Sequence, residues 1–182
     1  MLPEISLNIL DIAQNSISAK ASLIQIKVET DSDRNLLNVT IADNGKGMTE
    51  EMLTAVTDPF FTTRTTRSVG LGVPFFKQAA ECTGGNFSVS SFPGSGTTVT
   101  AQFHTDHIDC MPLGDVNATV HALVTMNPSV DFIYERRADD RSFCLDTRQM
   151  REILGDVPFD QPEVAAFIRS YLEENETEIM KL

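Results

Sequence analysis

The sequence predicts an α/β fold, because segments with helical spacing alternate with segments of strand character along the chain. Eight of the ten glycines lie between Gly45 and Gly96, so one part of the chain is built around glycine turns and the rest is not. These glycines occur in pairs, adjacent or two residues apart. Such pairs mark places where the backbone approaches another group closely or takes a positive φ. Hydrophobic residues make up 41% of the 182 residues and charged residues 22%, which is typical of a globular protein rather than a disordered one.

The elements of the first part follow from local patterns. Ile5, Ile9 and Ile12 recur at helical spacing and predict a helix over 4–18. Residues 58–69 have no period and are rich in threonine. The other expected elements are strands at 23–28 and 37–42 joined by a hairpin loop at 31–33, a short helix at 49–57, a helix from Pro74 to Thr83, and strands at 86–91 and 97–104.

The region after His104 differs in charge and in glycine content. Residues 1–104 hold seven basic and ten acidic side chains, a formal charge of −3, whereas 105–182 hold seven and sixteen, a charge of −9. We therefore expect one domain at 1–104 and a small acidic α+β appendage at 105–182. By analogy at the level of folds, the appendage would bind a partner or dimerise. Its expected elements are a helix at 112–126, strands at 131–136 and 142–146, and helices at 147–154 and 162–175.

Charge and composition exclude several classes of function. A formal net charge of −12 opposes binding to nucleic acid and to anionic membranes. No apolar run approaches the roughly 18 residues of a membrane span, and the first residues have no signal-peptide pattern. Cys82, Cys110 and Cys144 form no CxxC pair, so we expect reduced thiols in a cytoplasmic protein.

A cluster at 104–110 contains two histidines, two aspartates and one cysteine. Its spacing matches no common zinc pattern, because structural zinc usually takes paired Cys or His ligands at fixed spacings. We interpret 104–110 as an acidic linker.

The first of four short motifs lies on the opening helix. Asp11 and Asn15 are four residues apart and share a helix face, which Ser18 extends. A carboxylate and an amide one turn apart can hold a hydrated Mg²⁺ and orient a water molecule. Taken alone, the pattern is more typical of a solvated helix face.

The second motif, Asp43-Asn44-Gly45-Lys46-Gly47-Met48, directly follows an apolar strand. An aspartate at a strand end can accept a hydrogen bond from an exocyclic amine, and the glycines let a flat ring lie against the backbone. The alternative is a simple turn, for which Asp-Asn-Gly is well suited.

The third motif, Gly70-Leu71-Gly72, precedes the Pro74 helix, where backbone N–H groups and the helix dipole attract an anion. The fourth, Gly94-Ser95-Gly96-Thr97-Thr98, also suits a hairpin turn. The segment before the third motif concentrates hydroxyl donors and positive charge, which favours a phosphate site over a plain loop; its residues are Thr62, Thr63, Arg64, Thr66 and Arg67.

In this order, the four motifs resemble the GHKL ATPase superfamily, which includes DNA gyrase, a heat-shock chaperone, histidine kinases and the mismatch-repair protein MutL. The resemblance covers about residues 4–104. Residues 58–64 resemble the F box of the histidine-kinase catalytic domain and 70–73 its second glycine box, whereas 14–19 are also similar to the MutL type. The resemblance implies a two-layer sandwich of the Bergerat type, with helices on one face of a mixed sheet.

The resemblance also implies roles for individual residues, with ATP and Mg²⁺ as cofactors. Asn15 corresponds to the asparagine that ligates Mg²⁺, and Asp43 to the aspartate that reads the adenine amino group. Gly45, Gly47 and Met48 belong to the box that shapes the adenine pocket. Residues 49–69 correspond to the mobile lid, in which Arg64 or Arg67 is available to the γ-phosphate. The remaining binding residues that the resemblance implies are Thr62, Thr63, Gly70, Leu71, Gly72, Thr97 and Thr98.

Two departures from the family pattern bear on activity. Asp11 stands where hydrolytic members carry a glutamate that activates water. Its side chain is one methylene shorter, which draws the carboxylate back by about an ångström and favours ATP binding over fast hydrolysis. In addition, no phosphoacceptor hairpin precedes the domain in this sequence, and His104, His107 and His121 lack the family's His-Glu pattern.

Three functions remain open from the sequence. We favour a histidine-kinase-like domain that transfers the ATP γ-phosphate to a separate protein. The alternatives are a MutL-like ATPase switch that dimerises with ATP, and a nucleotide-binding module without turnover.

Overall fold

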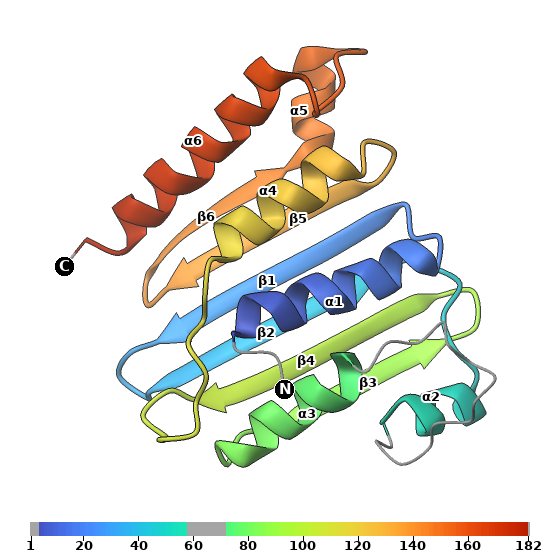
Figure 1. Cartoon of the computed structure of the whole chain (residues 1–182), viewed down its shortest axis with the longest axis vertical. Coiled ribbons are helices and arrows are strands. Elements are labelled where there is room, and N and C mark those ends of the chain that lie inside the picture. The colour runs from blue at the N-terminus through green and yellow to red at the C-terminus, as the bar shows by residue number, and fades with distance from the viewer. Residues whose placement is uncertain (1–3, 58–71, 182) are drawn as a thin grey trace.

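The computed structural model describes residues 4–57 and 72–181 and contains one six-stranded sheet, in the order β3-β4-β2-β1-β5-β6 (Figure 1). The β1–β5 pair is parallel, and all other neighbouring strands are antiparallel. The sheet is therefore mixed. The strands are β1 (Leu23–Asp31), β2 (Leu36–Asp43), β3 (Phe87–Phe92), β4 (Gly96–His104), β5 (Asp131–Ala138) and β6 (Arg141–Asp146).

The helices supply the second layer. In Figure 1, α1, α3 and α4 lie over the same face of the sheet, and α6 lies alongside β6. This arrangement confirms the predicted two-layer α/β sandwich with helices on one face of a mixed sheet. The helices are α1 (Ile5–Ser18), α2 (Glu50–Thr57), α3 (Gly72–Cys82), α4 (Val116–Met126), α5 (Thr147–Leu154) and α6 (Pro162–Ile179).

Alternation along the strands decides which side chains are buried. Ile24, Ile26 and Val28 of β1 face the helices and are almost completely buried. Ile26 lies opposite Ile41 of β2 and beside Tyr134 of β5, so the same face is buried across three strands. The intervening positions of β1 are polar and partly or fully exposed, as expected for a sheet with one open face.

The region after residue 104 continues this sheet. It has the expected α-β-β-α-α order, but its strands are not set apart: β5 pairs with β1 from Leu23↔Asp131 to Thr30↔Ala138. Parallel neighbours need a crossover connection, and α4 supplies it over the helix-covered face. The buried apolar residues of both regions form one continuous cluster. The predicted acidic appendage therefore shares a sheet and a core with the first region.

The connection between β4 and α4 is tied to the start of α1. The backbone N–H groups of Ile5 and Ser6 donate to the carbonyl oxygens of Pro112 and Leu113, at 3.0 and 2.8 Å. Two of the N–H groups that a helix start leaves free are satisfied in this way. Within the described ranges, no three His, Cys, Asp or Glu side chains are placed to hold a metal ion, and that includes residues 104–110.

The cysteines and the apolar character of the helices bear on two further expectations from the sequence. Cys82, Cys110 and Cys144 are free thiols. Across residues 4–57 and 72–181, no helix combines the length and the apolar character that crossing a bilayer requires.

The shared core predicts that Phe132→Ala, at the sheet junction, weakens both regions together. Phe132 is 1% exposed, and truncating a buried phenylalanine costs about 3–5 kcal/mol of unfolding free energy. Amide hydrogen exchange should therefore speed up in β2 as well as in β5. Phe167→Ala, at a side chain that is 60% exposed, is the control and should change stability by less than about 0.5 kcal/mol. Unchanged protection of β2 in Phe132→Ala would show that the regions unfold separately.

Candidate nucleotide-binding site

A cavity of about 120 Å³ lies between α1, α2, the first turn of α3 and the adjoining ends of β2 and β4. Its apolar wall includes Ile12, Ile41, Met48 and Val99. Its polar groups come from both layers and include Asn15, Ser16, Ser18, Asp43 and Thr97. Mostly apolar walls with a few placed polar groups are typical of a small-molecule site.

Asp43 is the best-defined polar group of the cavity. It ends β2, opposite Thr97 of β4. Its Oδ2 accepts a hydrogen bond of 2.6 Å from the Ser16 hydroxyl, and its Oδ1 accepts one of 2.8 Å from the backbone N–H of Gly45. A carboxylate has about four acceptor positions, so a carboxylate held by two donors can accept another from a ligand.

Two serines that the sequence analysis missed organise the site. Ser16 is buried and links α1 to the end of β2 through Asp43. Ser91 in β3 accepts a bond of 2.8 Å from the Met48 N–H and donates one of 2.9 Å to the Gly96 carbonyl. Its hydroxyl is also 2.8 Å from that of Thr97. Ser16 directly follows Asn15, and this adjacency is the one sequence signal that could have found it.

Gly47 is required for the turn after β2. Its φ is +67°, and a Cβ there would lie 1.9 Å from the carbonyl oxygen of Phe92. The turn and the β3–β4 loop therefore touch backbone to backbone. This fits the predicted role of Gly47 in shaping the pocket, because any side chain would separate the two segments.

Asn15 and Asp11 lie one turn apart on α1. Asn15 lines the cavity, and its buried amide nitrogen has no hydrogen-bond partner among the described residues. A Cβ added to Gly72 would lie only 2.0 Å from a carboxylate oxygen of Asp11. The absent side chain of Gly72 thus lets the first turn of α3 pack directly against Asp11. The predicted pairing of Asp11 and Asn15 on one face is found beside this helix start.

The remaining predicted residues fall into two groups. Thr97 lines the cavity, but Thr98 is not among the lining residues. Since successive side chains of a strand point to opposite faces, Thr98 faces the open side of the sheet, and its predicted contact with a ligand has no support here. Thr62, Thr63, Arg64, Gly70 and Leu71 lie outside the described residues, as do most of the predicted lid and the F box.

A family model described as "Histidine kinase-, DNA gyrase B-, and HSP90-like ATPase" matches residues 1–107, which is more than half of the chain. The chain belongs to this ATPase family. The resemblance to the GHKL superfamily is confirmed.

Several relatives of this GHKL domain are sensor kinases. It is 33% identical over 94 residues to the sensor histidine kinase ZraS of Klebsiella oxytoca, covering 50% of this chain and 20% of that protein. It is 35% identical over 101 residues to the signal transduction histidine-protein kinase AtoS of Escherichia coli strain K12, covering 55% and 16%. The match thus spans a fifth or less of the length of these relatives.

Solved structures extend the fold likeness beyond residue 107. The N-terminal domain of a DNA repair protein has a TM-score of 0.58 at 12% identity and covers 80% of this chain and 53% of its own. The Aquifex aeolicus MutL ATPase domain complexed with ADP has a TM-score of 0.52 at 12% identity, with coverages of 85% and 70%. Residues 1–107 are about three-fifths of the chain, so both matches include part of the C-terminal region. At this identity, they show the fold of the GHKL domain.

We expect Asp43→Asn to weaken ATP binding at least tenfold. The amide has no negative charge, so it would lose the charge-assisted hydrogen bond expected from the adenine amino group. Such a bond contributes about 1.5–3 kcal/mol. Ser16→Ala should weaken binding less, since it releases Asp43 without removing its charge. Isothermal titration calorimetry measures both. Ser90→Ala, on the open face, is the control and should bind as the wild type does. Full affinity in Asp43→Asn would remove Asp43 from the site.

Gly47→Ala should destabilise the fold by several kcal/mol, because both the backbone conformation and the contact with Phe92 oppose a Cβ. Gly94→Ala is a matched control. Gly94 also has a positive φ, +77°, but a Cβ there meets no atom within 4 Å, so the expected cost is about 1–2 kcal/mol from the backbone alone. Urea denaturation followed by circular dichroism compares the two. Equal losses would mean that the contact with Phe92 contributes nothing.

Proposed function

We propose that this GHKL domain binds Mg²⁺·ATP and transfers the γ-phosphoryl group to a separate protein. The observation that carries the proposal is the pair of uncommitted side chains on α1. The carboxylate of Asp11 and the amide of Asn15 make no side-chain hydrogen bond with the described residues. Asp11 lies against Gly72 at the start of α3, and Asn15 lines the cavity together with Val73 of that helix. The names of ZraS and AtoS as histidine kinases support transfer over other uses of ATP.

The adenine would occupy the described cavity. At about 120 Å³ it is smaller than the roughly 300–1,000 Å³ of complete small-molecule sites, so it suits a single planar base. Ile41 and Val99 offer apolar surface for the ring, and Asp43 accepts from the amino group. The ribose and phosphates would then extend along α1 toward Asp11 and Gly72.

Asn15 is the proposed Mg²⁺ ligand. Mg²⁺ in phosphate sites usually keeps several waters and takes only one or two protein oxygens, so one amide oxygen together with the ATP phosphates suffices. The ion would neutralise the charge on the phosphates during transfer. From the sequence resemblance, we also assign Thr62, Thr63, Arg64, Gly70 and Leu71 to the phosphate side of the site.

The phosphoryl acceptor would belong to another protein. His104 ends β4 opposite Leu36, at the end of β2 that lies away from Asp43. The ring of His121 is hydrogen-bonded to the Ala165 carbonyl oxygen of α6. His107 lies in the linker beside Asp109. A partner's histidine nitrogen or hydroxyl oxygen would attack the γ-phosphorus, and the bond to the β–γ bridging oxygen would break to release ADP. We therefore propose a role in two-component-type signalling in the cytoplasm, a compartment that suits three free cysteines.

One observation favours a second candidate, an ATP-hydrolysing switch. Asp11, which lies against the start of α3, would accept a proton from water attacking the γ-phosphate. The MutL ATPase domain named above was solved with ADP, and a MutL-like switch would couple ATP to self-association. A binding module without turnover is the third possibility.

The test follows γ-labelled ATP with Mg²⁺, the purified protein and a fractionated extract of the source cells. We expect label on a second protein. Asn15→Ala should lower this transfer about 100-fold or more through loss of transition-state charge stabilisation, whereas Asp11→Asn should retain it. Free phosphate that appears with wild type alone and disappears in Asp11→Asn would favour the switch. Bound ATP with neither product would favour the binding module.

A further inference from the structure

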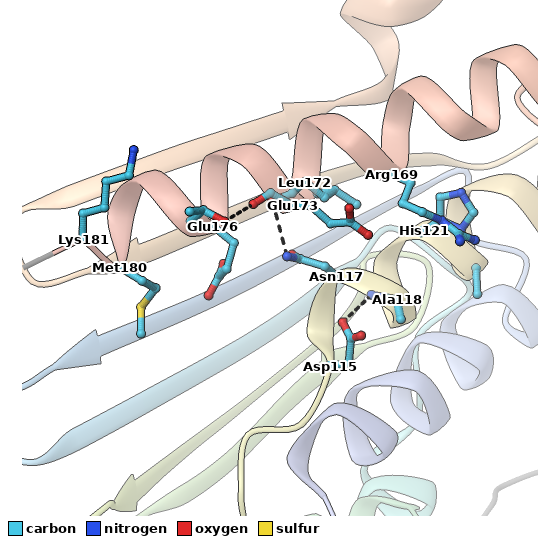
Figure 2. Close-up of a pocket in the computed structure, with 12 residues that line it drawn as sticks. Asp115, Asn117, Ala118, His121, Arg169, Leu172, Glu173, Glu176, Met180 and Lys181 are labelled. Carbon is cyan, nitrogen blue, oxygen red and sulfur yellow. Dashed lines mark hydrogen bonds between the residues drawn. The ribbon is translucent and has the colours of Figure 1, made fainter.

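A second, larger groove lies between α4 and α6, well apart from the nucleotide cavity (Figure 2). Its volume is about 900 Å³, within the roughly 300–1,000 Å³ of small-molecule sites. The two sites share no lining residue. The groove is therefore a candidate site for a second ligand.

Charge is arranged along the groove by sign. Asp115 lies at the start of α4, and Glu173 and Glu176 lie one turn apart on α6, in the middle of the groove (Figure 2). Arg169 and Lys181 lie toward its two ends. They are twelve positions apart on mostly helical chain, which corresponds to about 18 Å. Negative charge is thus concentrated at the centre.

Two buried oxygens of the groove lining have no donor among the described residues. The Asn117 amide nitrogen donates to the Leu172 carbonyl at 3.3 Å, which leaves its Oδ1 buried without a partner. Glu176 Oε1 accepts from Arg136 at 3.3 Å, and its Oε2 is likewise buried without a partner. In each group one atom fixes the side chain and the other is left to accept. Buried acceptors without donors are rare in folded proteins, so these two call for a ligand or a water molecule.

Tyr134 adds a third such atom beneath the groove. Its side chain rises from the helix-covered face of β5 and is fully buried, and its hydroxyl has no partner. Burial, together with the charges of Glu176 and Asp115 from the two sides of the groove, raises the pKa of Tyr134, so the hydroxyl stays protonated. Of the five buried side-chain atoms that lack a partner among the described residues, two thus belong to residues that line the groove and a third to Tyr134, whose pKa is raised by two carboxylates of that lining.

The cation already present cannot serve these atoms. Arg136 is 2% exposed and directs its guanidinium to Glu176 Oε1, to the Val28 carbonyl and to the Thr30 hydroxyl. It holds β5 to β1 and α6 to the sheet. Asn117 and Glu176, which carry the two unpartnered oxygens, both line the groove.

We propose that the α4–α6 groove binds a cationic nitrogen group, an ammonium or a guanidinium, between Asn117, Glu173 and Glu176. Such a group supplies the N–H donors that the two oxygens lack and the positive charge that the central carboxylates attract. A metal ion fits less well, since the described residues place no three carboxylate, histidine or cysteine side chains to hold one. The nitrogen group could belong to a free polyamine or to a lysine or arginine of a partner protein.

Calorimetry on the full chain at low ionic strength tests this proposal with three probes: spermidine, N-acetyl-arginine amide and N-acetyl-citrulline amide, the last being a neutral copy of the second. We expect a saturable 1:1 complex with at least one cationic probe and none with the citrulline compound. Stronger binding of spermidine would indicate a free polyamine, and stronger binding of the arginine compound a protein side chain. Absence of saturation with both cations at millimolar concentration, or equal binding of citrulline, would overturn the proposal and leave water as the occupant.

A matched pair of variants locates the complex. Glu173→Gln should weaken binding about tenfold, as the loss of one charge-assisted hydrogen bond does. Glu173 is exposed and its side chain makes no hydrogen bond within the described residues, whereas changing Glu176 would also release Arg136. Asp33→Asn removes one exposed charge from the β1–β2 loop and should bind as the wild type does. Equal affinity in wild type and Glu173→Gln, or equal weakening in both variants, would contradict a site in this groove.

Discussion

The packing of α1 on the sheet is the contact on which the proposed nucleotide site depends. Ile5, Ile9, Ile12 and Ala13 are at most 3% exposed, so one stripe of the helix is fixed against the core. A helix held along one stripe cannot rotate, and its other positions are then placed by the 3.6-residue period. This is why Ser16 reaches the end of β2, while Asn15 and Asp11 point along the side that leads to α3.

The same packing connects the nucleotide region to the rest of the chain. The β4–α4 connection satisfies the first N–H groups of α1, and α4 then carries the chain across to β5, which pairs with β1. One sheet and one core thus hold two separate hollows, one at the ends of β2 and β4 and one between α4 and α6. Both are lined by helices packed on a single sheet.

Features that depend on neighbouring residues could be predicted from the sequence. The stripe of α1, the β1–β2 hairpin and the Asp43–Gly47 turn all follow from short-range patterns, and the ordered motifs indicated the family. The side of the sheet to which Thr97 and Thr98 point could also have been predicted, since adjacent strand residues cannot both face one cavity.

Features that depend on distant residues could not be predicted. The pairing of β5 with β1 joins segments more than a hundred residues apart, and no local pattern distinguishes it from a hairpin in a separate unit. Ser91 resembles any strand serine until the fold places it against Met48 and Gly96. The buried oxygens of Asn117 and Glu176 likewise become significant only when α6 lies beside α4.

We propose that the nucleotide base binds in the cavity between α1, β2 and β4. The most direct measurement is a map of amide chemical-shift changes by NMR, with Mg²⁺ and a non-hydrolysable ATP analogue. We expect large changes at Gly45, Met48 and Thr97 and in the side-chain amide of Asn15, with none along α6. Changes gathered on α6 or on the open face of the sheet, with Asn15 and Met48 unmoved, would contradict it.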